Sequence, residues 1–245
     1  QSAIALGEWS NIPHYKDILS ALFLQTGTAI VSTDPQTGLY QQRLLDGGAE
    51  GGEGEIPSAN ALNFYTSFAD QASTQFSWSR PLPLSIDMFL SGKSAFYIGR
   101  ASELFTIQAR NPNLNFDVTT LFQAEDAVRP ITYGLFSGVG IIKSSPNFPA
   151  AYKGIGYLTD KEFVEYLSGA LATPSTRRDL LLTQQTNPYV QVYFQAALSA
   201  FGWPDTNTAG TESVFRDMIR KVNSGATNPT QAIYEASRDL QSIVR

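Results

Sequence analysis

The sequence SAIALGEWSN at residues 2–11 indicates the fold class, because it passes from an apolar run directly into a polar turn. Residues 2–6 predict a short buried strand, and Gly7 ends that strand at a turn. A helix is expected next, since Pro13 opens a segment with apolar residues at helical spacing that stops at Gly27. A strand that leads through a turn into a helix is the building unit of α/β folds.

Further helices and strands follow along the chain. A helix is expected to begin near Pro57, and another covers residues 85–90. A strand over 94–98 leads at once into a helix over 101–109. The remaining expectations are a surface loop over 32–55, strands over 116–122 and 132–142, and helices over 148–158, 160–171, 176–184, 188–201, 211–224 and 229–243. This order predicts an α/β chain with an additional helical layer at its C-terminal end.

Composition excludes several classes of function. The 245 residues carry 17 Lys and Arg against 22 Asp and Glu, a formal net charge of −5, and no basic cluster that would bind nucleic acid. The chain has no cysteine and a single histidine, His14, so thiolate catalysis, zinc-thiolate sites and multi-histidine metal sites cannot be assembled. No apolar run approaches the roughly 18 residues of a membrane helix. We therefore expect neither a metal nor an organic cofactor.

The strongest candidate binding residues lie in the turn after the first strand. Glu8, Trp9, Ser10 and Asn11 set a large aromatic among hydrogen-bonding groups where a buried strand ends. Ligand clefts of α/β proteins lie outside strand ends. An indole face stacks on the apolar face of a sugar while neighbouring polar groups bond its hydroxyls. The alternative is that Trp9 simply packs under a loop, as buried tryptophans commonly do.

Two other stretches offer similar chemistry. Arg100, Ser102 and Glu103 follow the strand over 94–98 and repeat the passage from strand to polar turn to helix. Trp203 places a further aromatic in a turn beyond a predicted helix, with the same alternative of simple packing. These residues extend the predicted site for a small polar solute.

Several short motifs occur in a characteristic order. They are AIALG at residues 3–7, ALNFY at 61–65, DMFLSGKSAF at 87–96, SSPN at 144–147 and VNSG at 222–225. In this order the chain resembles the extracellular solute-binding proteins of bacterial ABC importers, in the carbohydrate-binding group that includes maltodextrin-binding proteins. The resemblance spans nearly the whole chain but lacks the family's N-terminal part.

The resemblance implies a type II periplasmic-binding-protein-like architecture of two α/β lobes that close over a ligand. Residues 1–127 and 186–245 would form the C-terminal lobe with its helical layer, and residues 128–185 would be a partial segment of the N-terminal lobe. The implied partners are a small-molecule solute, in particular a sugar, and an ABC permease at the membrane. The implied location is periplasmic or extracellular, either free or anchored as a lipoprotein.

The resemblance also bears on the ligand residues. The turn with Glu8 and Trp9 matches a ligand turn of the family. Arg100 and its neighbours stand where many relatives have a stacking tryptophan, and Glu212 stands where some have an aromatic pair, so a smaller or more polar sugar, or a non-sugar solute, is an open alternative. Two other functions stay open: a carbohydrate-active hydrolase that uses a carboxylate pair, and an interaction scaffold without a small ligand. The acids considered for the pair are Asp87, Glu103, Asp117 and Glu212.

Overall fold

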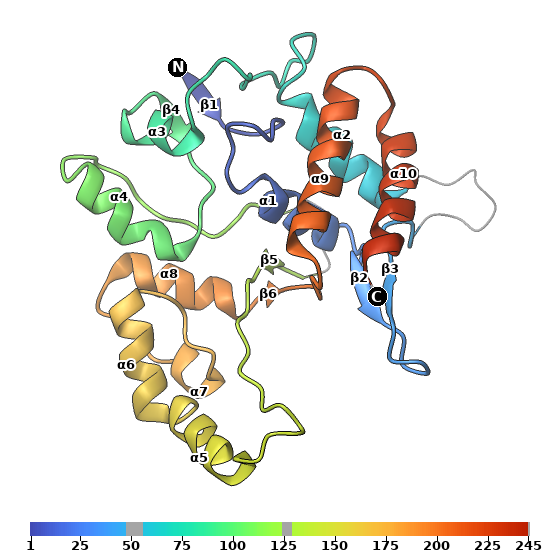
Figure 1. Ribbon diagram of the computed structural model, residues 1–245. Coiled ribbons are helices and arrows are strands. Elements are labelled where there is room, and N and C mark those ends of the chain that lie inside the picture. The colour runs from blue at the N-terminus through green and yellow to red at the C-terminus, as the bar shows by residue number, and fades with distance from the viewer. Residues whose placement is uncertain (48–55, 124–128, 245) are drawn as a thin grey trace. The chain divides into compact units, whose positions relative to one another are not determined.

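The computed structural model describes residues 1–47, 56–123 and 129–244 of the chain, drawn in Figure 1. Two compact units make up the structure. Unit 1 consists of residues 1–99, 122–133 and 201–245, and unit 2 of residues 100–121 and 134–200. These boundaries differ from those of the lobes expected from the resemblance, and the assignment of lobes stays a prediction.

Unit 1 contains most of the strands and four of the longer helices. Its elements are β1 (Ser2–Ile4), α1 (Tyr15–Gln25), β2 (Val31–Thr33), β3 (Tyr40–Gln42), α2 (Pro57–Ser67), α3 (Ser85–Leu90), β4 (Ser94–Phe96), β5 (Thr132–Tyr133), α9 (Thr208–Asn223) and α10 (Pro229–Ile243). β1 pairs in parallel with β4, with Ser2 opposite Ser94. β5 pairs with β6 (Ala200–Phe201), a strand divided by the boundary between the units.

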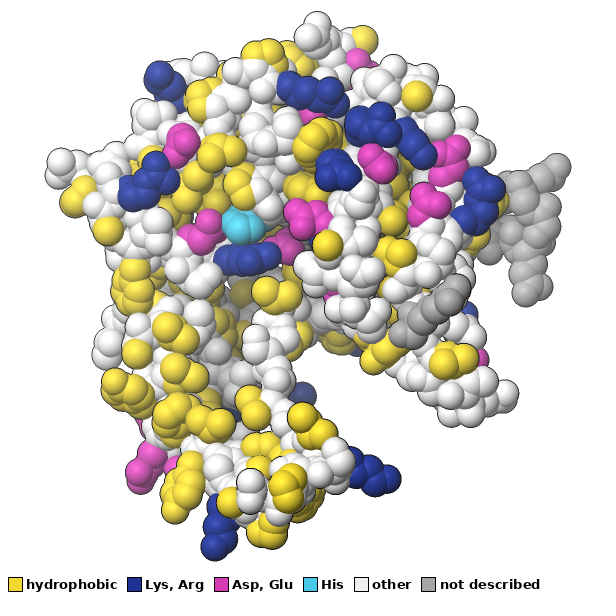
Figure 2. All heavy atoms as spheres, in the orientation of Figure 1, with side chains coloured by type: hydrophobic (Ala, Val, Ile, Leu, Met, Phe, Trp, Pro, Cys, Tyr) yellow, Lys and Arg dark blue, Asp and Glu magenta, His cyan; other side chains and the backbone are white. Residues whose placement is uncertain are grey.

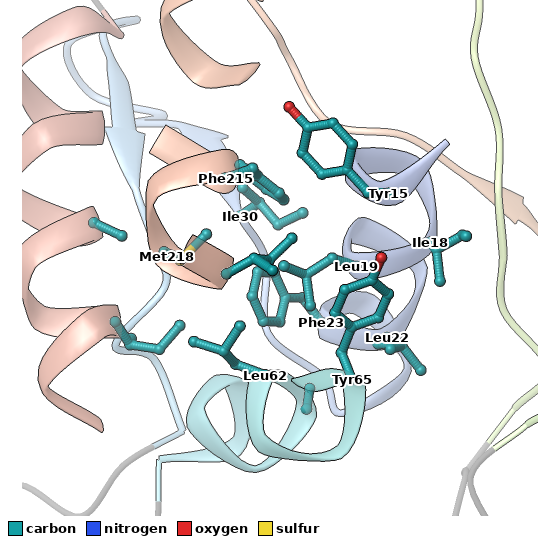
Figure 3. Packing of buried hydrophobic residues seen from close by; sticks show 14 of the residues in the cluster. Tyr15, Ile18, Leu19, Leu22, Phe23, Ile30, Leu62, Tyr65, Phe215 and Met218 are labelled. Carbon is teal, nitrogen blue, oxygen red and sulfur yellow. The ribbon is translucent and has the colours of Figure 1, made fainter. Parts of the chain in front are cut away.

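The hydrophobic core of unit 1 lies among helices that come from both ends of the chain (Figure 3). Leu19 and Phe23 of α1 are fully buried, as helical spacing of apolar residues requires. The Phe23 ring packs against Phe215 of α9, with ring centroids 5.9 Å apart. Leu62 of α2 and Met218 of α9 complete this contact region. The core therefore joins segments almost 200 residues apart.

A polar network beside this core also connects α1 to Asp205, just before α9, and to Thr211 in the first turn of α9. The Lys16 ammonium donates to Asp205 Oδ2 and to Thr211 Oγ1, each at 2.6 Å. The Thr211 hydroxyl donates in turn to Asp205 Oδ1 at 2.9 Å. Both ionic side chains are less than one-fifth exposed, so solvent screens the Lys16–Asp205 pair less than it screens a surface salt bridge.

Unit 2 is mainly helical. Its elements are the 3-10 helix η1 (Ala101–Glu103), α4 (Leu104–Arg110), α5 (Phe148–Leu158), α6 (Lys161–Leu171), α7 (Arg178–Leu181) and α8 (Pro188–Ala197).

The predicted bounds of α5 and of α10 in unit 1 are confirmed, and those of α6 agree within one residue. The Asn187 and Asn228 side chains accept backbone N–H bonds at the starts of α8 and α10, as their Asn-Pro sequences predict.

The predicted long strand over 132–142 is wrong. Only residues 132–133 pair as a strand, and the apolar side chains after them are exposed, with Val139 at 66% and Ile142 at 76%. A continuous apolar run forms a buried strand only where neighbouring strands cover it. The described part of the chain supplies no such neighbouring strand for residues 135–142. The local apolar pattern alone was therefore not enough to predict whether this segment forms a strand. The strand expected over 116–122 is likewise absent from the structure.

Two other expectations need correction. The surface loop expected over 32–55 contains an antiparallel hairpin of β2 and β3, with Val31 opposite Gln42. Asp34 closes its turn, since Oδ1 accepts from the backbone N–H groups of Gln36 and Thr37 at 2.8 and 3.0 Å. The part of this expected loop at 48–55 lies outside the described residues. The helix expected over 188–201 ends at Ala197, as the strand β6 follows.

None of the helices in the described ranges combines the length and the apolar character needed to cross a membrane.

Replacing Phe23 with Ala should lower the free energy of unfolding by about 3–5 kcal/mol, because it removes a fully buried ring and leaves a cavity. Phe96 is 62% exposed and provides the matched control. Its replacement with Ala should change stability by no more than about 0.5 kcal/mol. Urea unfolding followed by circular dichroism measures both values, and equal losses would contradict the described core.

Candidate functional site

The candidate site is built on the turn that follows β1. Gly7 has φ of +92°, and an added Cβ would lie 2.6 Å from the backbone nitrogen of Ala69. Only glycine therefore allows this approach of the turn to the segment after α2. The Gly7 carbonyl accepts a 2.7 Å hydrogen bond from Asn223 Nδ2 at the end of α9. The turn is held from two sides by segments distant in sequence.

Glu8 is engaged inside unit 1. Its side chain is 7% exposed, and both carboxylate oxygens accept from Arg80 Nε, at 3.0 and 3.1 Å. Its backbone carbonyl accepts a 2.8 Å bond from the buried Tyr65 hydroxyl. Burial, and then the charge of Glu8, raises the pKa of Tyr65 well above its ordinary value. The Glu8 carboxylate thus supports the turn from within.

Asn11 is also an internal residue. Its Nδ2 donates to the carbonyls of Ser79 and Leu82 at 2.9 and 3.0 Å, and its Oδ1 accepts from Trp78 Nε1 at 2.9 Å. Its backbone carbonyl accepts from the Ser85 N–H. A buried amide with these bonds fixes the segment between α2 and α3 to the turn. Asn11 therefore positions the candidate site.

Trp9 and Ser10 are the residues of the turn that reach the surface. Ser10 is exposed, and Trp9 is partly buried against the hydrophobic core. The Trp9 Nε1 atom is buried and has no hydrogen-bond partner within the described residues. The Arg216 guanidinium lies over the indole, with Cζ 5.8 Å from the ring centroid.

Arg216 belongs to a polar group on the first turns of α9. Its Nη2 donates to Ser213 Oγ at 2.7 Å. Glu212, four residues earlier on the same helix, is exposed, and its carbonyl accepts from the Tyr15 hydroxyl at 3.1 Å. Burial, and then the charge of Glu212, raises the pKa of Tyr15 well above its ordinary value. Charged side chains of both signs gather over α9 and α10 in Figure 2.

The sequence-based candidates did not include Arg216. The available signal was its spacing from Glu212, because residues four apart share one face of a helix. The indole and this guanidinium provide a stacking surface and directional hydrogen-bond donors on unit 1.

Trp203 has a packing role. Its side chain belongs to the core, with Nε1 donating to Ser20 Oγ at 3.2 Å. Its ring stacks on Phe215 at 6.1 Å with an interplanar angle of 4°, and the Lys16 ammonium lies 5.2 Å from its centroid. The indole expected to face a ligand is therefore 9% exposed and covered by its own protein.

The second predicted turn lies in unit 2. The Arg100 backbone N–H donates to Glu103 Oε2 at 2.7 Å, which closes the start of η1. Ser102 is exposed and Glu103 is half-buried. The predicted residues therefore form two groups: Arg100, Ser102 and Glu103 in unit 2, and the others in unit 1.

The acids considered for hydrolysis are divided in the same way. Asp87 and Glu212 belong to unit 1, and Glu103 and Asp117 to unit 2. Asp117 borders an open hollow of about 510 Å³ beside the start of α8, where it is the one acid among the lining residues Asn115, Phe116, Asp117, Pro188 and Tyr189. In the described residues no group of His, Cys, Asp and Glu is suited to hold a metal ion.

Comparisons with known proteins identify the fold. No family model and no curated protein sequence matches the chain. Among solved structures, an ABC transporter solute-binding protein from Thermotoga lettingae TMO, bound with alpha-D-tagatose, is similar over 100% of this chain, with a TM-score of 0.65 and 18% identity. A cyclo/maltodextrin-binding protein complexed with maltotetraose is similar over 99%, with a TM-score of 0.70 and 16% identity. The chain has a type II periplasmic-binding-protein-like fold.

The maltose-maltodextrin binding protein of the thermoacidophilic bacterium Alicyclobacillus acidocaldarius has this fold as well, with 92% of the chain covered, a TM-score of 0.65 and 13% identity. The chain spans 60%, 59% and 59% of the lengths of these three structures. The chain thus corresponds to about three fifths of a binding-protein fold.

Replacing Tyr65 with Phe should lower the free energy of unfolding at pH 7 by about 1–3 kcal/mol, because the buried Glu8 carbonyl loses its donor. The pKa of Tyr65 is higher in the folded than in the unfolded chain, so its contribution is present below its ordinary pKa of 10.0 and is lost as pH rises above it. The difference between wild type and variant should therefore shrink above pH 10. Denaturant titrations at pH 7 and pH 10.5 measure it, and a difference that grew with pH would contradict this account.

Proposed function

We propose that this chain is part of a non-catalytic solute-binding protein that binds a sugar and delivers it to an ABC-type importer at the membrane. The observation that carries the proposal is the similarity of the whole chain to binding proteins whose structures hold tagatose and maltotetraose. A periplasmic or extracellular location, free or as a lipoprotein, belongs to the same proposal. The ligand would act by favouring a closed arrangement of lobes, which requires tighter binding to the closed state than to the open state.

On unit 1, the proposed ligand surface consists of Trp9, Ser10, Arg216 and Ser213, with Glu212 at its edge. The indole would pack against the apolar face of a sugar ring, while the guanidinium and the hydroxyls bond its oxygens. Glu8 and Asn11 contribute by holding the turn that carries Trp9, since their side chains are occupied by internal hydrogen bonds. Arg100, Ser102 and Glu103 stay candidate ligand residues of unit 2, considered by itself.

The proposal is non-catalytic because the similar proteins are named for binding. Chromogenic glycosides provide a direct test. The protein should release no chromophore from them, while a thermal-shift screen with unmodified sugars should find a stabilising ligand. Turnover that disappears on replacing two of the four acids would favour the hydrolase instead.

Replacing Trp9 with Ala should weaken binding of the sugar found in that screen by about 1–3 kcal/mol, because a stacked aromatic contact is lost. This corresponds to roughly a 5- to 150-fold increase in Kd. Calorimetry measures the change, and Trp9→Phe should recover part of the affinity. Phe76→Ala is the control, since that ring is a partly exposed aromatic of the same unit outside the proposed surface. An unchanged affinity in Trp9→Ala would exclude this surface.

Replacing Arg216 with Lys should raise the Kd of the same sugar at least about threefold, because a lysine lacks the planar array of donors that can bond two oxygens at once. Arg220→Lys is the matched control. Arg220 lies one turn further along α9, is exposed and pairs with Asp217 at 3.2 Å, so its replacement should leave the Kd within about twofold. Equal changes in Kd for the two substitutions would contradict the proposed role of Arg216 in the ligand surface.

A further inference from the structure

Arg216 differs from the other cations of α9 in its charge balance. The helix carries three cations, and two of them are paired: Arg220 with Asp217 at 3.2 Å, and Lys221 with Glu235 at 2.6 Å. Among the residues that the structure describes, Arg216 has no carboxylate within 4.0 Å. It is also half-buried, so water screens its charge less than that of an exposed side chain. Its positive charge is therefore not balanced by a direct contact.

The Arg216 guanidinium also keeps donors in reserve. A guanidinium has five N–H donors and no acceptor. One of its nitrogens, Nη2, donates to the Ser213 hydroxyl, and the group lies over the Trp9 indole. Within the described ranges, Nε and Nη1 have no hydrogen-bond acceptor, and neither has the buried Nε1 of Trp9. The candidate surface of unit 1 thus holds N–H groups that its own residues leave without acceptors.

The acids of the same region do not supply these acceptors. Both carboxylate oxygens of Glu8 are engaged by Arg80 Nε, and the side chain is 7% exposed. Glu212 lies one turn before Arg216 on α9, but the two form no ion pair. Burial, and then the charge of Glu212, raises the pKa of Tyr15, which indicates that this carboxylate lies near the Tyr15 hydroxyl. The charged group that remains for a ligand is a donor.

A ligand that fits this surface needs acceptor oxygens with negative charge. A carboxylate accepts only, and its two oxygens match two parallel N–H groups of a guanidinium. Such charge-assisted bonds are shorter and stronger than those to a neutral hydroxyl. A neutral sugar presents hydroxyls that each donate as well as accept, and the donated hydrogens would find no free carboxylate beside Arg216. The arrangement of donors therefore favours an acidic sugar over a neutral one.

We propose that Arg216 makes the protein selective for sugars that carry a carboxylate, the uronic acids. The guanidinium binds the carboxylate, and the Trp9 indole packs against the sugar ring. The selectivity is local, because the formal net charge of −5 gives the chain no general attraction for anions. This inference rests on the proposed function and deepens it by naming the class of sugar.

Matched pairs of sugars test the selectivity. Calorimetry at pH 7 compares glucuronate with glucose and galacturonate with galactose, each as the monosaccharide and as the disaccharide. In at least one pair the acid should bind about tenfold or more tightly than its neutral counterpart, because hydrogen bonds to charged groups contribute more than neutral ones. Raising NaCl from about 0.05 to about 0.5 M should reduce this preference, since salt screens the charge pair.

Substitutions then test whether Arg216 is the cause. Arg216→Gln should lower the preference for the acid to less than about twofold, because it removes the charge, and Arg216→Lys should retain part of the preference. Arg220→Gln is the control and should leave the preference unchanged, since Arg220 is exposed and bound to Asp217. The methyl ester of the uronic acid removes the charge from the ligand instead, and should bind as weakly as the neutral sugar even if Arg216→Gln does not fold.

The outcomes separate this inference from the proposed function. Equal Kd values for acid and neutral sugar would overturn the inference and leave sugar binding in place. A preference for the acid that survives Arg216→Gln, or that extends to the methyl ester, would overturn the role of Arg216. Absence of binding by every acidic and neutral sugar in the series would overturn the inference together with the proposed function.

Discussion

The burial of Phe23 between α1, α2 and α9 is the contact on which unit 1 depends. It brings the C-terminal helices onto a helix that begins at Tyr15, and the same packing sets α9 beside the turn after β1. Arg216 can lie over Trp9 because Phe215, the preceding residue, is held in that core. The candidate surface is thus a product of long-range packing, in which neighbouring residues on α9 face the interior and the turn.

Local sequence patterns predicted much of the helical structure and little of the pairing between distant segments. The Asn-Pro starts of α8 and α10 follow from capping residues within a few positions of each other. The strand over 132–142 depends on neighbours that no local pattern contains. The β2–β3 hairpin was missed because its strands are only three residues long and lie next to a glycine-rich stretch.

The same contrast holds for the candidate site: local patterns predict some of its features, while others depend on residues distant in the sequence. The turn after β1 could be predicted as a strand end, and it carries Trp9, the indole candidate that is only partly buried. The internal roles of Glu8 and Asn11 could not be predicted, because their partners Arg80 and Trp78 lie 72 and 67 positions away in the sequence. The packing role of Trp203 could not be predicted either, because Phe215 and Lys16, which cover its ring, lie outside its own turn in the sequence. A polar residue beside an aromatic is therefore a candidate only when its own hydrogen bonds are known.

The bonds that fix Gly7 and Glu8 to Asn223 and Tyr65 have a consequence for the energetics of recognition. A turn whose carbonyls are held by two separate helices has little conformational freedom left to lose. A molecule that docks against Trp9 would meet an already ordered surface, so less of its interaction energy would be offset by freezing the backbone. Encounter on such a surface would be governed by diffusion and desolvation, with no slow loop-ordering step before contact.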